Sequence, residues 1–212
     1  MNLDMAVIAT GNPHKLREIG EILKDFNIEI KSMKDMGLEN LNIIEDGDTF
    51  EENALKKART IMKASGCISI ADDSGLEVEA LDNQPGVNSA RFAGENASDE
   101  ENNEKLLKIL THKNIKNPRA RFVCVIAVVM PNGESFTTRG ELYGIIGSEC
   151  RGNNGFGYDP LFIPDGYNGL TLGEISEIEK NKISHRAKAL KKMEILFRER
   201  LKNVRIEDNS NK

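Results

Sequence analysis

The sequence lacks an excess of basic residues. Its 212 residues contain 29 Lys and Arg against 34 Asp and Glu, which gives a formal net charge of −5. A protein whose main task is to wrap nucleic acid needs a basic surface. We therefore expect no nucleic-acid partner, and any anionic ligand must be met by local cations.

The sequence also lacks a membrane or export signal and is poor in cysteine. No apolar run is long enough to span a bilayer, and the amino terminus shows no basic segment followed by an apolar one. Cys67, Cys124 and Cys150 have no Cys-x-x-Cys spacing, which favours buried free thiols over a zinc site or a disulfide. We expect a cytoplasmic protein without a membrane partner.

The composition is that of an ordinary globular protein. With 39% hydrophobic residues, 30% charged residues and no internal repeat, the chain predicts one domain over residues 1–203. The polar tail, residues 204–212, is expected to lack regular structure.

The most informative stretch is Ala71-Asp72-Asp73-Ser74-Gly75, which follows a short apolar run typical of a buried strand. Open α/β sheets bind ligands outside the carboxyl ends of their strands. Paired carboxylates there need a cation or several donors, and Mg²⁺ prefers carboxylate oxygen. The pair predicts either a magnesium site or the cap of a turn. Because neighbours on an extended strand face opposite sides, one carboxylate should face the ligand while the other holds loop amides.

A second candidate site lies near the amino terminus. The apolar run Met5–Ala9 predicts a strand, and apolar residues at helical spacing follow the loop of residues 10–15. Free backbone N–H groups at the start of that helix, together with Lys15, form either an anion-binding site or an ordinary helix start.

An acidic loop over residues 43–48 precedes another predicted helix. Thr49 and Glu52 have capping-box spacing, and Gly66 ends the apolar stripe that follows. Asn53 and Lys57 are four residues apart and share one face of this helix. Acids in this loop either stabilise the helix amino terminus or supply a second magnesium ligand; the candidates are Glu45, Asp46 and Asp48.

The remaining patterns predict a mixed α/β sheet. Residues 120–130 and 135–143 are joined by the turn Pro131–Glu134 and should form an antiparallel pair. Further strands are expected around residues 28–30 and 76–81, and Ser98 with Glu101 predicts a helix.

Two candidate ligand contacts lie near the carboxyl terminus. Residues 152–160 are too glycine-rich for regular structure, so Phe156 or Tyr158 either offers a ring to a ligand or packs into the core. Ser184 is typical of the N-cap of a terminal helix. His185 and Arg186 in its first turn oppose the helix dipole, which favours an anionic or oxygen-rich partner.

Taken together, these motifs resemble the inosine triphosphate pyrophosphatase family, which removes non-standard purine nucleoside triphosphates. The matching residues run in family order along nearly the whole chain: Thr10-Gly11-Asn12 with Lys15, Thr49–Ala54 with Lys57 and Ala58, Ala71–Leu76, Pro85-Gly86 with Ser89-Ala90-Arg91, Gly155–Pro160, and Ser184-His185-Arg186. Gly173 departs from the alanine usual in the family, and we expect it to loosen a local helix.

The resemblance implies an elongated α/β fold with a long, mixed, twisted β-sheet flanked by helices and two lobes around a central cleft. It further implies a homodimer, a Mg²⁺ cofactor and hydrolysis of ITP, dITP and XTP to monophosphate and pyrophosphate, which cleanses the nucleotide pool. Pyrophosphatases for other modified nucleotides and a non-catalytic nucleotide sensor are the alternatives.

Residue roles carried over from the family divide into three groups. Asp73 is the implied catalytic base, and Glu45 with Asp73 the implied metal ligands, with Asp72 as an additional candidate. The implied substrate-binding residues are Thr10, Gly11, Asn12, Lys15, Asn53, Lys57, Ser74, Phe156, Gly157, Tyr158, Asp159, Lys180, His185 and Arg186. Arg186, as a donor only, would favour a 6-oxo purine over adenine.

Overall fold

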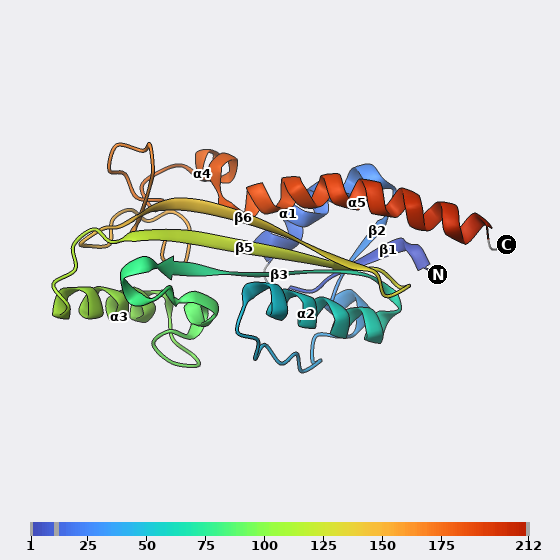
Figure 1. Ribbon diagram of the computed structural model, residues 1–212, viewed down its shortest axis with the longest axis horizontal. Coiled ribbons are helices and arrows are strands. Elements are labelled where there is room, and N and C mark those ends of the chain that lie inside the picture. Colours follow the sequence, from blue (N-terminus) through green and yellow to red (C-terminus); the bar gives the residue numbers. More distant parts are fainter. Residues whose placement is uncertain (1, 11–12, 211–212) are drawn as a thin grey trace. The chain divides into compact units, whose positions relative to one another are not determined.

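The computed structural model describes residues 2–10 and 13–210 (Figure 1), without the side chains of residues 2, 13, 14, 18 and 203–210. Within these ranges the strands form a seven-stranded sheet in the order β2-β1-β3-β5-β6-β7, with β4 beside β3. The strands are β1 (Asn2–Ile8), β2 (Glu29–Ser32), β3 (Cys67–Val78), β4 (Gln84–Pro85), β5 (Arg119–Val129), β6 (Ser135–Ile146) and β7 (Phe162–Pro164). β1 pairs in parallel with β2 and β3, whereas β4 and β7 pair antiparallel with β3 and β6. The predicted mixed sheet is confirmed.

Helices flank the sheet, as the sequence predicts. They are α1 (Pro13–Leu23), α2 (Phe50–Ser65), α3 (Asp99–His112), α4 (Glu177–Ile183) and α5 (His185–Ser210), with the short 3₁₀ helices η1 (Lys24–Phe26), η2 (Lys34–Met36), η3 (Glu79–Leu81) and η4 (Gly86–Arg91). Thr49 accepts a hydrogen bond from the Glu52 N–H, and Ser98 forms a complete capping box with Glu101. Both predicted helix starts are therefore confirmed.

The chain forms two compact units. Unit 1 comprises Met1–Asp73, Val125–Arg139 and Ala189–Lys212, and unit 2 comprises Ser74–Cys124 and Gly140–Lys188. In unit 1, α1 and α5 lie on one side of the strands and α2 on the other (Figure 1). The Phe26 and Phe197 rings meet edge to face with centroids 5.0 Å apart, which ties η1, the 3₁₀ helix directly after α1, to α5.

Unit 2 has its own hydrophobic core. Leu76 of β3, Leu106 of α3 and Phe122 of β5 are buried in it. The Phe122 and Phe162 ring centroids are 4.7 Å apart. This packing positions α3 and the irregular segment of residues 147–161 against the strands of the same unit.

Three elements differ from the prediction. β3 runs without a break from Cys67 to Val78, so it joins the two strands expected on either side of residues 72–75. Leu76 and Val78 are buried in the unit 2 core, and residues 77–78 pair with β4. Residues 79–81, expected to continue the second strand, form η3 instead. Helix α4 was not predicted, although Ser176 and Glu179 have the spacing of an N-cap pair. The helix α5 continues to Ser210, through most of the segment for which no regular structure is expected, because adding residues to a formed helix costs little.

Residues 171–175 form a turn and not a regular helix, in line with the loosening expected at Gly173. Gly173 also allows close packing there. A Cβ on Gly173 would lie 2.6 Å from the Arg151 carbonyl oxygen, and one on Gly152 would lie 2.0 Å from the Gly173 carbonyl group. Main chain crosses main chain at this point, and neither glycine leaves room for a side chain.

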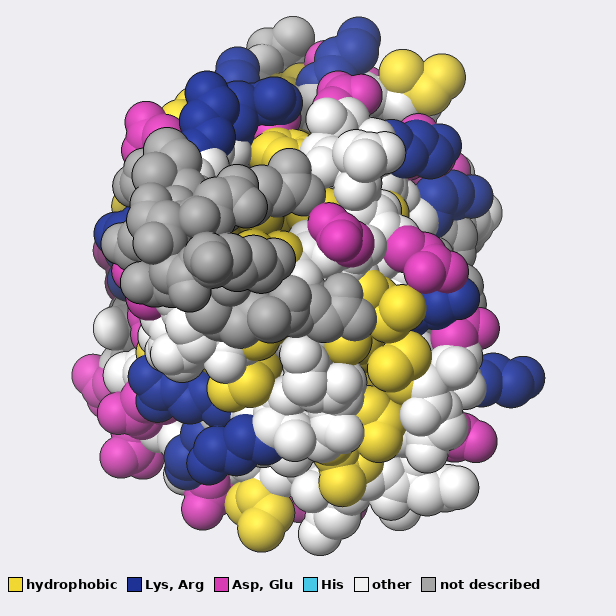
Figure 2. Space-filling view, turned by 90° about the vertical axis from the view of Figure 1, so that its right-hand side faces the viewer, with side chains coloured by type: hydrophobic (Ala, Val, Ile, Leu, Met, Phe, Trp, Pro, Cys, Tyr) yellow, Lys and Arg dark blue, Asp and Glu magenta, His cyan; other side chains and the backbone are white. Residues whose placement is uncertain are grey.

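The structure shows the state of the cysteines and the distribution of charge on one face of the surface. The three cysteines are thiols rather than disulfides; Cys67 and Cys124 are buried, whereas Cys150 is exposed, contrary to expectation. None of the described helices is both long enough and apolar enough to cross a bilayer. On the face drawn in Figure 2, Lys and Arg side chains are interspersed with Asp and Glu side chains.

Candidate active site

Asp72 and Asp73 point to opposite sides of β3, as alternation along an extended strand requires. Asp72 is only 3% exposed, and its Oδ2 lies 2.6 Å from the Nζ of Lys15 in the first turn of α1. A lysine, rather than loop amides alone, therefore neutralises Asp72, which corrects the expectation. Asp73 instead interacts with Lys57 and Asn53 of α2 and with Glu45.

Lys57 connects the acidic loop to β3. Its Nζ lies 3.0 Å from Glu45 Oε2 and donates to the Asp72 carbonyl oxygen at 3.1 Å. Asp46 instead forms an ion pair with Lys56 at the surface. The backbone N–H of Asp48 donates to Glu52 Oε2 at 2.9 Å, as part of the start of α2. Of the three candidate acids, Glu45 is the one that interacts with both Lys57 and Asp73.

Asn53 is only 1% exposed and holds the acidic loop in place. Its Oδ1 accepts a hydrogen bond of 2.8 Å from the Gly47 N–H, and its side chain also hydrogen-bonds to Asp73. These contacts make Asn53 a residue that positions the loop and the Asp73 carboxylate, whereas the resemblance implies direct contact with substrate.

Asp73 has an unusual electrostatic environment. Burial raises its pKa from 3.8 to about 6, and the Glu45 and Asp72 carboxylates add to the rise. Lys57 and the Asn53 hydrogen bond oppose it but do not cancel it. A carboxyl group whose pKa lies near neutrality is suited to act as a general base.

The donor set fits a hard divalent cation. Glu45 and Asp73 are neighbouring carboxylates whose mutual repulsion a bound cation would relieve. Among the described residues no group of three or more His, Cys, Asp or Glu side chains comes together as a metal site. Mg²⁺ is commonly held by one or two carboxylates together with substrate phosphates, so two acids suffice.

The segment between β1 and α1 is described only in part. Gly11 and Asn12 lie outside the described residues. Thr10 follows β1 by two residues and is partly buried, and its N–H donates to the Ile8 carbonyl oxygen at 3.0 Å. Ser74 is a partly buried residue of β3 and is the first residue of unit 2.

A second cluster, in unit 2, surrounds Phe156. Asp159 is 2% exposed; its Oδ2 accepts from the Phe156 N–H at 2.8 Å and forms an ion pair with Lys180. The Lys180 Nζ lies 4.6 Å from the Phe156 ring centroid, and the Arg186 guanidinium carbon lies 5.8 Å from it. The ring itself is 48% exposed. A half-exposed ring beside two cations can stack on a planar base and offer hydrogen-bond donors to its oxygens.

Burial controls the charges in this cluster as well. It raises the pKa of Asp159, although Lys180 and the Phe156 N–H favour the charged carboxylate. Burial also raises the pKa of Tyr158, whose hydroxyl donates to the Ser89 carbonyl oxygen at 2.9 Å. Tyr158 is 4% exposed, so of the two alternatives for this aromatic side chain the structure selects core packing rather than ligand contact.

His185 lies in the same unit. Its imidazole stacks on the Phe122 ring, with centroids 4.9 Å apart and planes 11° apart. Sequence reasoning identified His185 but missed Phe122, because Phe122 belongs to an apolar strand run and carries no local signal of its own.

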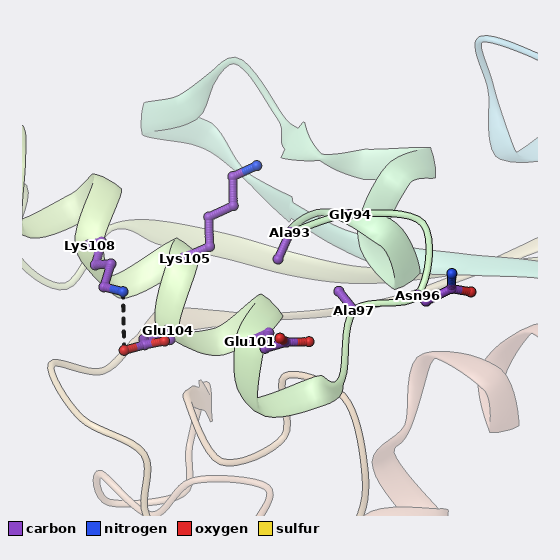
Figure 3. Close-up of a pocket in the computed structure, with 8 residues that line it drawn as sticks. All are labelled: Ala93, Gly94, Asn96, Ala97, Glu101, Glu104, Lys105 and Lys108. Atoms are coloured by element: carbon purple, nitrogen blue, oxygen red, sulfur yellow. Dashed lines mark ion pairs between the residues drawn. The ribbon is translucent and has the colours of Figure 1, made fainter.

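A pocket of about 480 Å³ lies elsewhere in unit 2, between residues 93–97 and one side of α3 (Figure 3). The lysines along that side already have partners. Lys108 Nζ lies 3.1 Å from Glu104 Oε1, and Lys105 Nζ donates a hydrogen bond to the Phe92 carbonyl oxygen. None of the predicted site residues that the structure describes lines this pocket.

Comparison with known proteins confirms the predicted resemblance. The Ham1 family model matches residues 6–195. A dITP/XTP pyrophosphatase of Clostridium perfringens is 48% identical, over 88% of this chain and 94% of that relative. One of Thermoanaerobacter sp. (strain X514) is 51% identical, over 92% of this chain and 97% of that relative.

A solved structure of a HAM1 protein from Coxiella burnetii is similar to this chain in fold. It has a TM-score of 0.86 and 39% identity, covers 94% of this chain and is itself covered completely. With the family model spanning most of the residues and the same α/β architecture in a solved relative, the chain belongs to the Ham1 family.

Proposed function

We propose that this chain hydrolyses the non-standard purine nucleoside triphosphates dITP, XTP and ITP to the nucleoside monophosphate and pyrophosphate. Relatives about half identical over most of both chains are named dITP/XTP pyrophosphatases. The observation that carries the proposal is the charged cluster of unit 1, in which Lys57 contacts Glu45 and β3 beside an Asp73 with a raised pKa.

The triphosphate and a metal ion are assigned to unit 1. Glu45 and Asp73 would hold Mg²⁺, which when bound supplies positive charge to the phosphate oxygens. Lys57 and Lys15 contribute further positive charge next to these acids. Positioning and electrostatic stabilisation of this kind account for most of the catalysis of phosphoryl transfer.

Asp73 is proposed as the general base. It takes a proton from the attacking water while an oxygen–phosphorus bond forms, and the bond between the α- and β-phosphates breaks to release pyrophosphate. In the metal-free site burial raises the pKa of Asp73 to about 6, so the carboxylate is largely ionised at neutral pH and able to accept a proton. Asn53 holds the carboxylate in place for this step.

The purine is assigned to the Phe156 cluster of unit 2. Lys180 and Arg186 carry only hydrogen-bond donors, so they match the 6-oxo group of hypoxanthine or xanthine and not the 6-amino group of adenine. A donor left unpaired by the wrong base can lower its reaction rate by several orders of magnitude. The proposal also includes a homodimer and a cytoplasmic location, which the resemblance implies.

The test is an assay of pyrophosphate and phosphate release across ITP, dITP, XTP, GTP and ATP, with Mg²⁺ and with EDTA. We expect pyrophosphate from the first three, far slower reaction with ATP and GTP, and loss of activity in EDTA. Equal rates for ATP and dITP would contradict the assigned specificity. Binding of dITP without any pyrophosphate release would indicate a nucleotide sensor instead.

A further inference from the structure

The first turn of α3 is attached to the loop that carries Phe156. Asp99 and Asn103 are four residues apart and therefore share one face of α3. Asp99 Oδ2 accepts a hydrogen bond of 2.6 Å from the Gly157 N–H, and Asn103 Nδ2 donates to the Gly157 carbonyl oxygen at 2.8 Å. One residue of the loop thus has both of its main-chain polar groups held by the helix.

Gly157 directly follows Phe156, so its conformation affects the direction of the main chain at Phe156. Its φ of +62° lies in the left-handed region, between the half-exposed Phe156 and Tyr158, whose hydroxyl is bound to Ser89 in the core. On the other side, the Phe156 N–H is bound to the buried Asp159. Together with these contacts, the two hydrogen bonds to Gly157 restrain the main chain that carries the Phe156 ring.

Stability alone does not explain Asn103. Its side chain is 4% exposed, and among the described residues its buried Oδ1 has no hydrogen-bond partner. A buried amide with one unpaired group is less favourable for folding than an apolar side chain of similar size. The contact that this costly residue does make is the one to Gly157.

The helix dipole does not explain Asp99 either. Glu100 and Glu101 already place negative charge in the first turn of α3, and Ser98 caps it. Glu100 is exposed, so it provides a matched acid in the same turn from which no contact to the loop is seen in the structure.

We propose that Asp99 and Asn103 are positioning residues that orient Phe156, and through it the purine, by holding Gly157 from α3. This inference rests on the proposed function, since it assigns the Phe156 cluster to base recognition. Neither residue touches substrate; each acts through the loop.

The experiment compares Asp99→Ala and Asn103→Leu with the wild type and with two matched controls. Glu100→Ala removes an acid from the same turn, and Asp99→Asn keeps an oxygen that accepts from Gly157. Kinetics with dITP are combined with calorimetric titration of deoxyinosine monophosphate and of inorganic pyrophosphate, at a temperature where thermal melts show every variant folded.

We expect Asp99→Ala and Asn103→Leu each to raise the KM for dITP about tenfold while kcat stays within about twofold, because base contacts are lost equally from ground and transition states. Binding of deoxyinosine monophosphate should weaken to the same degree and pyrophosphate binding should not change. Glu100→Ala should behave like the wild type, and Asp99→Asn should recover most of the lost affinity.

Several outcomes would overturn the inference. Unchanged monophosphate binding in both variants would do so, and so would a parallel loss of monophosphate and pyrophosphate binding, which indicates general damage. If Asn103→Leu does not fold, Asn103→Asp replaces the donor by an acceptor in the same shape and must show the same selective loss. A wild type that binds deoxyinosine monophosphate but releases no pyrophosphate from dITP would overturn the proposed function and leave the positioning test intact.

Discussion

The Lys57 ammonium and the Glu45 carboxylate form an ion pair of 3.0 Å that joins α2 to the acidic loop, beside Asp73. Both side chains are more than half buried, so the pair is only partly screened by solvent. Lys57 thus lies where phosphate oxygens are proposed to bind. Glu45 lies where it would be one of the two proposed metal ligands.

Replacing the proposed base should stop turnover without unfolding the protein. Asp73→Asn is expected to lower kcat by about two to four orders of magnitude, because the amide cannot accept the proton and is a poorer metal ligand. Steady-state pyrophosphate release, with circular dichroism as the check on folding, measures this. Asp46→Asn removes an exposed acid paired with Lys56 and should remain fully active. A rate near that of the wild type for Asp73→Asn would remove Asp73 from the mechanism.

In the metal-free protein, Asp73 should contribute less to stability as the pH rises from about 4 to 7. The pKa of Asp73 is raised in the folded state from 3.8 to about 6 by burial, so in this window the folded state binds more protons than the unfolded state. The contribution of Asp73 to stability must then fall with rising pH, by up to about 3 kcal/mol for a shift of this size. Urea unfolding of the wild type and Asp73→Asn in EDTA at pH 4 and pH 7 tests this. Relative to the wild type, Asp73→Asn should gain stability between the two pH values and should be the more stable protein at pH 7.

The Lys15–Asp72 pair should be worth more than a surface pair. Lys15→Met leaves the Asp72 carboxylate, 3% exposed, without this partner and is expected to cost about 3 kcal/mol. Lys108→Met breaks an exposed pair with Glu104 and should cost less than about 1 kcal/mol. Urea unfolding at pH 7 compares the two. Adding Asp72→Asn to Lys15→Met should recover part of the loss, and simple additivity of the two losses would contradict the coupling.

The loop that carries Phe156 should not accept a side chain at Gly155. Its φ is +83°, and a Cβ there would lie 2.1 Å from Asp159 Oδ2. Gly155→Ala is therefore expected to displace Asp159 and to raise the KM for dITP at least about tenfold. Gly169→Ala imposes similar backbone strain, with φ +82° but no atom within 4 Å of the added Cβ. That control should melt earlier while keeping the KM of the wild type, and equal KM values in the two variants would contradict the role given to Gly155.

Local features of the fold were predictable from the sequence. The starts of α2 and α3 depend on contacts three residues apart, such as Thr49 with Glu52, and such contacts are visible in the sequence. Alternation likewise predicts that Asp72 and Asp73 face opposite sides of β3. A strand after Gly75 was predicted as well. Its continuity with the strand before Asp72 was not, because it depends on burial of Leu76 and Val78 among residues distant in the sequence.

For the site residues too, local features were predictable from the sequence and long-range contacts were not. Residue types suggested that Tyr158 could meet a ligand, but its hydroxyl is bound to Ser89, 69 residues away. Asp99 and Gly157 are 58 residues apart, and the helix-start pattern around Asp99 gives no sign of the contact between them. Identifying a side chain as chemically useful is thus possible locally, whereas deciding what it faces requires the tertiary structure.

The crossing of main chain at Gly152 and Gly173 has a consequence for any survey of substitutions along this chain. Both positions should tolerate glycine alone, although neither carries a functional group and no chemistry is assigned to them. Loss of function on substitution there would reflect the close approach of two main-chain segments. These two positions should therefore not be counted among the catalytic residues.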